Sequence, residues 1–235
     1  MRKRVFLKSP VRENRTPGSV RGLLGDWQSY RDARLQDTVG QYWHRIASIM
    51  IDIRLLSQLN PDDLYRLVTG YTSDAKYQVS VTESAQQFVL ALELVPLIQP
   101  YRKRYDRPDA EALERYQDLP ALGFSFGAYD GEQCVGIVLA EPSHWNKSLW
   151  VWELHVAESH RQRGVGGRLV EALTEKAHIA GLRVLVCETQ NTNIPAIRFY
   201  RKMGFQIEGI DLSYYTNDDF PEGEIAVFMK RRLMK

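Results

Sequence analysis

The sequence predicts an α/β (α+β) protein in which helices accompany a mixed β-sheet. Strand-like apolar runs recur along the chain, and its last third adds two helical runs, residues 169–180 and 193–203. A glycine-rich junction over residues 161–167 joins the strand-like run 149–156 to the first of these helices. Because ligands of α/β sheets gather where strands end, this junction is the first candidate for a site.

Each element in the first half of the predicted domain has a local signal. Residues 50–55 are typical of a first strand. Residues 60–63, Asn-Pro-Asp-Asp, predict a helix start, because a cap, a proline and first-turn acids coincide there. Alternating stretches over residues 76–95 indicate two strands or one bent strand, and the charged residues 101–119 indicate a helical or irregular segment.

The second half is expected to add a hairpin, further strands and a capped helix. Residues 122–129 and 133–141 flank Asp130-Gly131, a turn pair suited to positive φ, and so predict a β-hairpin. Asn193 is a natural N-cap and Gly204 a natural C-terminal stop for the helix between them. The remaining strands of the mixed sheet are expected at residues 148–156, 182–188, 204–215 and 224–230.

The junction has the composition of a pyrophosphate-binding loop. Its glycines are Gly164, Gly166 and Gly167. They allow a turn closed to other residues, so that successive N–H groups can converge on an anion at the positive end of the following helix. Positive charge around the loop comes from Arg161, Arg163 and Arg168. The alternative is an ordinary strand-to-helix turn, in which glycine is also common.

Two other phosphate-binding motifs are excluded at this loop. A P-loop requires Gly-Lys followed by Ser or Thr, whereas Gly166 is followed by Gly167 and Arg168. A dinucleotide fingerprint would place its third glycine at Leu169 and would follow its strand directly, yet residues 157–163 intervene before the first glycine. The loop is therefore neither a kinase or ATPase loop nor a Rossmann turn.

A second motif makes the pattern specific. Arg-x-x-Gly-x-Gly at residues 161–166, followed by Asn-Ile-Pro-Ala-Ile-Arg-Phe-Tyr-Arg-Lys-Met-Gly-Phe at 193–205, resembles the GNAT superfamily of N-acetyltransferases. The resemblance runs from about residue 50 to the C-terminus. Within the superfamily, Cys-Glu-Thr-Gln at 187–190, Phe-Tyr at 199–200 and Tyr-Tyr at 214–215 are most similar to streptothricin acetyltransferases. Similar features occur in enzymes that acetylate a ribosomal-protein N-terminus, so the acceptor stays open.

The resemblance implies a GNAT fold, with a mostly antiparallel sheet flanked by helices, and acetyl-CoA as co-substrate. It implies that the backbone of His155 and Val156 holds the thioester carbonyl and pantetheine, and that the Asn193 side chain holds the pantetheine amides. The full set of residues expected to bind acetyl-CoA is His155, Val156, Arg161, Gln162, Arg163, Gly164, Val165, Gly166, Gly167 and Asn193.

Acetyl transfer to an amine requires a base and benefits from an acid. An alkylammonium with a pKa of about 10.4 costs roughly 4 to 5 kcal/mol to deprotonate at neutral pH. Glu153, in an apolar strand, and Glu188, at a strand end, are both candidate bases, and the choice between them stays open. An ordinary ion pair is the alternative for either acid. Tyr200 is the candidate acid for the leaving thiolate, with packing beside Phe199 as its alternative role.

The acceptor is expected over residues 213–219. The side chains assigned to it are Tyr214, Tyr215, Asp218 and Asp219. Two ring faces beside two carboxylates suit an ammonium group, although a solvated hairpin loop would have the same composition. We expect a small cationic amine of the streptothricin or aminoglycoside type. The alternatives are a protein N-terminal or lysine acetyltransferase, and a non-catalytic acyl-CoA-binding module, which would need neither Tyr200 nor the two acids.

Charge divides the chain into a basic extension, residues 1–49, and an acetyltransferase domain, residues 50–235. The extension carries eight Arg and two Lys against four acids, a net of +6, whereas the other 21 basic and 25 acidic residues give −4. Residues 15–19 are typical of disorder and residues 26–48 of a helix. The extension lacks the interleaved aromatics of a nucleic-acid-binding arm.

The rest of the composition points to a soluble cytoplasmic enzyme. No apolar stretch approaches the roughly 20 residues of a membrane span, and no secretory segment is evident. Cys134 and Cys187 fall in predicted buried strands without metal or redox spacing, and His155 and His160 have no partners at ligand spacing. We therefore expect no metal, no nucleic-acid or membrane partner, and a small-molecule amine as acceptor, with a homodimer allowed.

Overall fold

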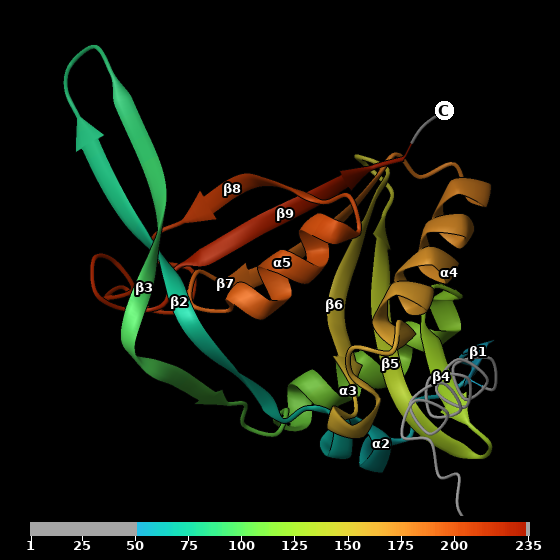
Figure 1. Ribbon diagram of the computed structural model, residues 1–235. Coiled ribbons are helices and arrows are strands. Elements are labelled where there is room, and N and C mark those ends of the chain that lie inside the picture. Colours follow the sequence, from blue (N-terminus) through green and yellow to red (C-terminus); the bar gives the residue numbers. More distant parts are fainter. Residues whose placement is uncertain (1–50, 234–235) are drawn as a thin grey trace, which may run out of the picture. The chain divides into compact units, whose positions relative to one another are not determined.

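The computed structural model describes residues 51–233, and its main element is a seven-stranded sheet in the order β1-β4-β5-β6-β7-β9-β8 (Figure 1). The strands are β1 (Ile51–Leu55), β4 (Phe126–Asp130), β5 (Gln133–Ser143), β6 (Ser148–Val156), β7 (Val184–Gln190), β8 (Gln206–Asp211) and β9 (Ala226–Arg232). Only the β6–β7 pair is parallel. The predicted mixed, mostly antiparallel sheet is confirmed. The basic extension and the helix expected at residues 26–48 lie outside the described residues.

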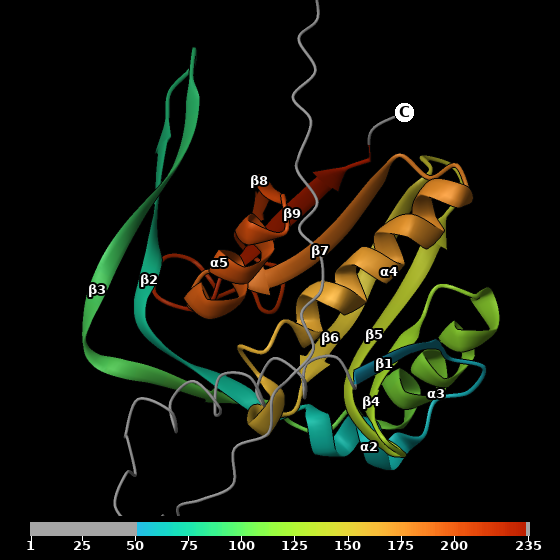
Figure 2. The same ribbon diagram turned by 45° about the vertical axis from the view of Figure 1, so that its right-hand side comes forward.

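Helices cover both faces of this sheet, and the alternation of β5 explains how. The helices are α2 (Pro61–Leu67), α3 (Ala110–Asp118), α4 (Val165–Ile179) and α5 (Ile194–Lys202). Val138 and Ala140 of β5 are buried in one cluster with α4 and α5, whereas Ile137 and Leu139 are buried in a second cluster with α2. Successive strand residues point to opposite faces, so β5 contributes to both cores. Figure 2 shows α4 lying along the sheet.

A long two-stranded arm, β2 (Gly70–Glu83) and β3 (Phe88–Arg104), forms a separate sheet that extends away from the main one (Figure 1). The two strands predicted within residues 76–95 are confirmed, but the expectation of a helical or irregular segment from residue 101 is wrong at its start. Residues 101–104 are strand because they pair with residues 70–73 of β2. Helix α3 begins only after Asp109, whose side chain caps it.

Strands β6 and β7 pair over four residues and then separate, which positions the site. Their register runs from Ser148 opposite Val184 to Val151 opposite Cys187 and goes no further. The pairing of β6 with β5 shifts between Leu139 and Ala140, and this bulge bends β6. Figures 1 and 2 both show the two strands diverging. The backbone of residues 152–156 is therefore not paired with β7.

Several local predictions are confirmed with adjusted boundaries. The hairpin around Asp130-Gly131 forms, with Gly131 at φ 59°. Asn193 caps α5. The strand expected over residues 204–215 spans only Gln206–Asp211, because the residues after it turn back into a loop. Cys134 and Cys187 are both free and buried.

Candidate active site

The glycine loop forms the N-terminus of a fifteen-residue helix, as predicted. Gly164 is the N-cap of α4 and has a φ of 82°, a left-handed conformation that favours glycine. No heavy atom lies within 4 Å of the position that a Cβ on Gly164 would take. The first N–H groups of a helix have no partner within it, and they carry the positive end of its dipole. The space at this helix N-terminus is therefore open, and the binding of a pyrophosphate there stays a prediction.

The expected positive φ at the other two glycines is wrong, because Gly166 and Gly167 lie inside α4. Gly166 instead lets α4 pack closely on α5. A Cβ there would lie 3.3 Å from two ring atoms of Phe199, a tight contact that requires the ring to shift by a few tenths of an ångström. A Cβ on Gly167 would meet Met203 Sδ at an ordinary 3.6 Å. Within this loop, a non-glycine residue with positive φ is Gln162, at 60°.

Arg161 is engaged in holding the loop. Its Nε donates to the Val156 carbonyl at 3.0 Å and its Nη2 donates to Thr69 Oγ1 at 3.0 Å. Glu158 lies 3.8 Å from its guanidinium. These contacts tie the loop to the end of β6 and to the residue before β2, so the predicted contact of Arg161 with a phosphate stays a prediction.

A groove begins at the glycine loop and follows α4. It has a volume of about 1150 Å³, and its lining includes Gly164, Gly167 and Arg168 at one end. Further along, Met203 and Gly204 line it at the C-terminal end of α5. Arg163 is exposed at the same loop. Farther along α4 the lining includes Glu171 and Glu175, so binding of an anionic ligand is expected only at the glycine-loop end and stays a prediction.

Tyr200 is buried beside the thiol of Cys187, where β6 and β7 separate. Its side chain is 7% exposed, and its ring lies 5.4 Å from that of Phe199 and 5.2 Å from that of Phe205. Burial raises the pKa of Tyr200 well above its ordinary value of 10.0, and the neighbouring Cys187 and Glu153 raise it further. The phenol therefore keeps its proton at any physiological pH and is a potential donor.

Glu188 lies at the end of β7 in a partly buried, acidic environment. Burial raises its pKa above the ordinary value of 4.5, and Glu224 and Glu153 add to the increase. Two groups oppose this increase in pKa. The Tyr215 hydroxyl donates a hydrogen bond to Glu188 Oε1, and the positive charge of Lys103 lies nearby. The net direction is upward, which makes Glu188 a stronger base than an ordinary carboxylate.

Glu153 is already hydrogen-bonded to its own strand. Its Oε2 lies 2.5 Å from His155 Nε2, and both side chains are on the same face of β6. The His155 ring in turn meets Tyr105 edge to face, with ring centroids 6.1 Å apart. The side chain of His155 therefore belongs to a network with Glu153 and Tyr105, whereas the prediction for His155 concerned only its backbone.

The sequence analysis missed a third carboxylate and the tyrosines around it. Glu224 accepts hydrogen bonds from Tyr71 at 3.1 Å, Tyr101 at 3.0 Å and Thr192 at 3.0 Å, and it is paired with Lys103. Polar side chains recur at every second position at the end of the arm, namely Tyr101 and Lys103 in β3 and Tyr105 directly after it. This alternation was the available signal, because it places Tyr101 and Lys103 on one face of β3.

Asn193 uses both ends of its amide within the protein. Its Oδ1 caps α5 by accepting from Ala196 N at 3.2 Å, and its Nδ2 donates to the Tyr105 hydroxyl at 3.3 Å. The expected contact with pantetheine amides stays a prediction.

The four predicted acceptor residues in the loop of residues 213–219 have two different environments. Asp219 is only 4% exposed and accepts from Tyr215 N at 2.7 Å and Thr216 N at 2.9 Å. It therefore folds the loop rather than facing an acceptor, and its expected role is corrected accordingly. Asp218 is exposed, and the rings of Tyr214 and Tyr215 pack edge to face at 5.2 Å. The Tyr215 hydroxyl is bonded to Glu188, and the acceptor role of these three side chains stays a prediction.

Within residues 51–233, no group of three or more His, Cys, Asp or Glu residues is arranged to hold a metal ion. None of the helices in that range is long and apolar enough to cross a membrane. The cytoplasmic location and the homodimer stay predictions.

Comparison with known proteins gives this site its class. The model of the acetyltransferase (GNAT) family matches residues 92–205. The streptothricin acetyltransferase of Streptomyces lavendulae is 31% identical over 163 residues, which cover 68% of this chain and 83% of the relative. Streptothricin acetyltransferase A of Bacillus subtilis (strain 168) is 34% identical over 133 residues, covering 55% and 72%.

Similar solved structures agree with these sequence relatives. The structure of nourseothricin acetyltransferase is 32% identical, has a TM-score of 0.59 and matches 79% of this chain and 99% of its own. A Bacillus anthracis protein solved with acetyl coenzyme A, 23% identical, shares the fold at a TM-score of 0.57 over 77% of this chain and 99% of its own. The chain belongs to the GNAT family of acetyltransferases. Within that family it is similar to the streptothricin acetyltransferases, and the expected acyltransferase activity is confirmed.

Proposed function

We propose that the protein transfers an acetyl group from acetyl-CoA to a primary amine of a small cationic acceptor of the streptothricin type. The observation that carries this proposal is the convergence of Glu153, Glu188 and Glu224 where β6 and β7 separate. Each of the other two carboxylates raises the pKa of Glu188, which shows that the three share one field. Tyrosine side chains surround them, and aromatic faces with carboxylates favour a cation.

The chain's own residues fit acetyl-CoA along the same opening. Gly164 leaves open space at the N-terminus of α4, where the N–H groups of Val165, Gly166 and Gly167 suit a pyrophosphate. Gln162 and Arg163 flank it on the exposed side. The backbone of β6 at His155 and Val156 pairs with β5 but not with β7, and although the Val156 carbonyl accepts from Arg161 Nε, the side toward β7 suits a pantetheine arm. Acetyl-CoA supplies the thioester whose acetyl group is transferred.

Glu188 is the proposed base. The incoming ammonium must lose a proton before its nitrogen can bond to the acetyl carbon, and a carboxylate of raised pKa accepts that proton more readily. Glu153 ranks second because the choice rests on the raised pKa of Glu188. Hydrogen bonding does not separate the two acids, since Glu153 Oε2 accepts from His155 and Glu188 Oε1 accepts from Tyr215. We propose that Glu153 orients His155 and adds negative charge to the acceptor site.

Tyr200 is the proposed acid. When the bond between the acetyl carbon and sulfur breaks, the departing thiolate requires a proton, and a phenol of raised pKa still holds one. The ring is fixed between Phe199 and Phe205, so its hydroxyl is held at one place beside Cys187. A fixed donor needs no rearrangement during the reaction.

The decisive experiment incubates the protein with acetyl-CoA and a panel of amines. The panel holds nourseothricin, an aminoglycoside, spermidine and a peptide with an N-terminal alanine. We expect an acetyl mass shift on nourseothricin, and a kcat/KM on it at least tenfold above that on the peptide. Acetylation of the peptide alone would replace this proposal by the protein-acetylating alternative.

A matched set of variants then assigns the base. Glu188→Gln keeps the side-chain volume and should lower kcat by about 10²-fold or more, the scale of general base catalysis. Glu153→Gln should mainly raise KM. Glu83→Gln, at the exposed end of β2, is the control and should behave as wild type. The reverse ranking, with kcat lost in Glu153→Gln and kept in Glu188→Gln, would move the role of base to Glu153.

A further inference from the structure

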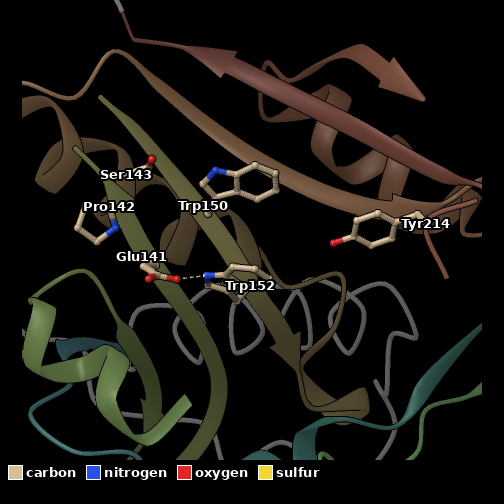
Figure 3. Close-up of a pocket in the computed structure, with 6 residues that line it drawn as sticks. All are labelled: Glu141, Pro142, Ser143, Trp150, Trp152 and Tyr214. Carbon is tan, nitrogen blue, oxygen red and sulfur yellow. Dashed lines mark hydrogen bonds between the residues drawn. The ribbon is translucent and has the colours of Figure 1, made fainter. Parts of the chain in front are cut away.

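A separate cavity of about 270 Å³ lies on the surface of β5 and β6, and three aromatic rings line it (Figure 3). The residues around it are Glu141, Pro142, Ser143, Trp150, Trp152 and Tyr214. The rings of Trp150 and Trp152 are nearly parallel, with an interplanar angle of 25° and centroids 6.0 Å apart. Phe228 packs against two of the three lining rings, since both Trp150 and Tyr214 meet it edge to face. The rings are therefore held by packing.

The cavity also has one carboxylate, which the protein already uses to hold a cation. Glu141 Oε2 accepts from Trp152 Nε1 at 2.8 Å, as the dashed line in Figure 3 marks, and from Arg115 Nη2 at 2.9 Å. The Arg115 guanidinium lies 3.7 Å from the centre of the Trp152 ring. Both hydrogen bonds end on Oε2, and no donor among the described residues is recorded for Oε1. Arg115 shows that this combination of ring and carboxylate binds a positive group.

Arg115 does not fill the cavity, because it is outside the set of lining residues. Tyr214 forms the wall of the cavity on the side opposite Glu141. In Figure 3 the Tyr214 hydroxyl points toward the space between the two indole rings. An entering group would meet aromatic faces and a carboxylate edge, which is the composition of a cation cage.

The cavity adjoins the proposed acceptor site through two short connections. Tyr214 packs edge to face on Tyr215, whose hydroxyl is bonded to Glu188. Phe228, which meets Trp150 edge to face, pairs with Glu188 across β9 and β7. A ligand that places one amine at Glu188 can therefore reach the cavity with another part of the same molecule.

We propose that this cavity binds a second cationic group, an alkylammonium or guanidinium, of the acceptor whose reacting amine lies at Glu188. The inference rests on the proposed function and deepens it, because it names an acceptor with at least two positive groups as the preferred class. Selection then comes from simultaneous occupation of two sites, and an acceptor with one positive group loses the second.

A binding measurement tests the cavity without requiring turnover. In ¹H–¹⁵N spectra of the full chain, the indole signals are assigned with Trp150→Phe and Trp152→Phe. Titration with cadaverine, a diamine, should shift these two signals, whereas its neutral diol counterpart should not. Equal shifts with both compounds would mean an apolar or planar-group site, and no shift with either would mean an empty cavity. Each of these two results would overturn the proposal.

Kinetics tests the same cavity during acetyl transfer. Glu141→Gln keeps one acceptor oxygen, which can serve Trp152 and Arg115, but removes the charge. It should raise KM for nourseothricin about tenfold with kcat within about twofold, and Trp150→Leu should do the same. Glu83→Gln and Trp145→Leu, at exposed positions, are the matched controls. A fall in kcat with unchanged KM would overturn the proposal.

The binding and kinetic experiments keep this inference distinct from the proposed function. If nourseothricin is not acetylated at all, the proposed function fails, and the cadaverine titration still decides whether the cavity binds cations. If nourseothricin is acetylated but Glu141→Gln and Trp150→Leu have wild-type KM values, only the second cation site fails.

Discussion

The hydroxyl of Tyr215 donates a hydrogen bond to Oε1 of Glu188, which joins the loop after β8 to the end of β7. The loop expected to receive the acceptor is thus in direct contact with the proposed base. Burial raises the pKa of Glu188, and this hydrogen bond opposes the increase because it stabilises the carboxylate. The loop therefore tunes the base as well as shaping the site.

Tyr215→Phe should move the acidic limb of the kcat/KM profile to higher pH. Loss of the donor removes a group that lowers the Glu188 pKa, so the carboxylate becomes protonated at a higher pH than in the wild type. The pH dependence of kcat/KM with nourseothricin measures this shift. Tyr65→Phe, on α2, serves as the control. A limb that stays in place or moves to lower pH would show that Glu188 does not control it.

Tyr200→Phe keeps the ring between Phe199 and Phe205 and removes only the hydroxyl. We expect kcat to fall about 10²-fold, the scale of general acid catalysis, with little change in CoA affinity. Steady-state kinetics at saturating substrates and calorimetry with CoA measure the two quantities. Unchanged kcat would mean that the thiolate leaves without help or that product release limits the rate.

Gly164 and Gly166 should respond to valine for different reasons. Gly164→Val forces a β-branched residue into positive φ, at a cost of about 1–2 kcal/mol or more, and should weaken CoA binding at least tenfold. Gly166→Val should press on the Phe199 ring and lower both kcat and the unfolding midpoint. Gly167→Ala is the stability control. Wild-type CoA affinity in Gly164→Val, measured by calorimetry, would contradict the anion site.

The two acids of the acceptor loop should differ in their salt response. Asp218 is exposed, so Asp218→Asn should raise KM at about 0.02 M salt and have little effect at about 0.5 M, where surface charges are screened. Asp219 is bonded to Tyr215 N and Thr216 N, so the defect in Asp219→Asn should persist at both concentrations. KM at the two ionic strengths distinguishes them. An equal response of the two variants would reject this division.

Glu224 should stabilise the attachment of the β2–β3 arm. Glu224→Gln leaves Lys103 without its partner and should lower the free energy of unfolding by about 2 kcal/mol. Burial raises the Glu224 pKa, but the hydrogen bonds and charge of Lys103 lower it below 4.5 overall. The charge contribution is therefore present above the ordinary pKa of 4.5 and is lost as the pH falls through the lowered pKa of Glu224.

Urea unfolding at about pH 7 and about pH 3 measures this difference, with Glu222→Gln at an exposed neighbouring position as the control. The gap between Glu224→Gln and wild type should narrow at the lower pH. A gap that widens on acidification would contradict the assigned direction of the pKa.

Much of the fold followed from signals a few residues long. The hairpin at Asp130-Gly131, the cap at Asn193 and the turn at Gly164 each depend on a local backbone conformation that the residue types reveal directly. The arm at residues 70–104 was predicted only in part, because residues 101–104 are strand through their pairing with residues 70–73. The strand propensity of single residues does not reveal such pairing.

The sequence by itself determined the family. From motif spacing and strand ends, which are local properties, it also predicted an anion-binding loop and catalytic roles for Tyr200, Glu153 and Glu188. The tertiary structure decided which side chains and charges surround these residues. Glu224 and the tyrosines of the arm join the site, and Trp150 and Tyr214 come to line one cavity, only because separate strands and loops fold together. Burial and neighbouring charge, which determine the pKa of Glu188 and Tyr200, arise from that packing.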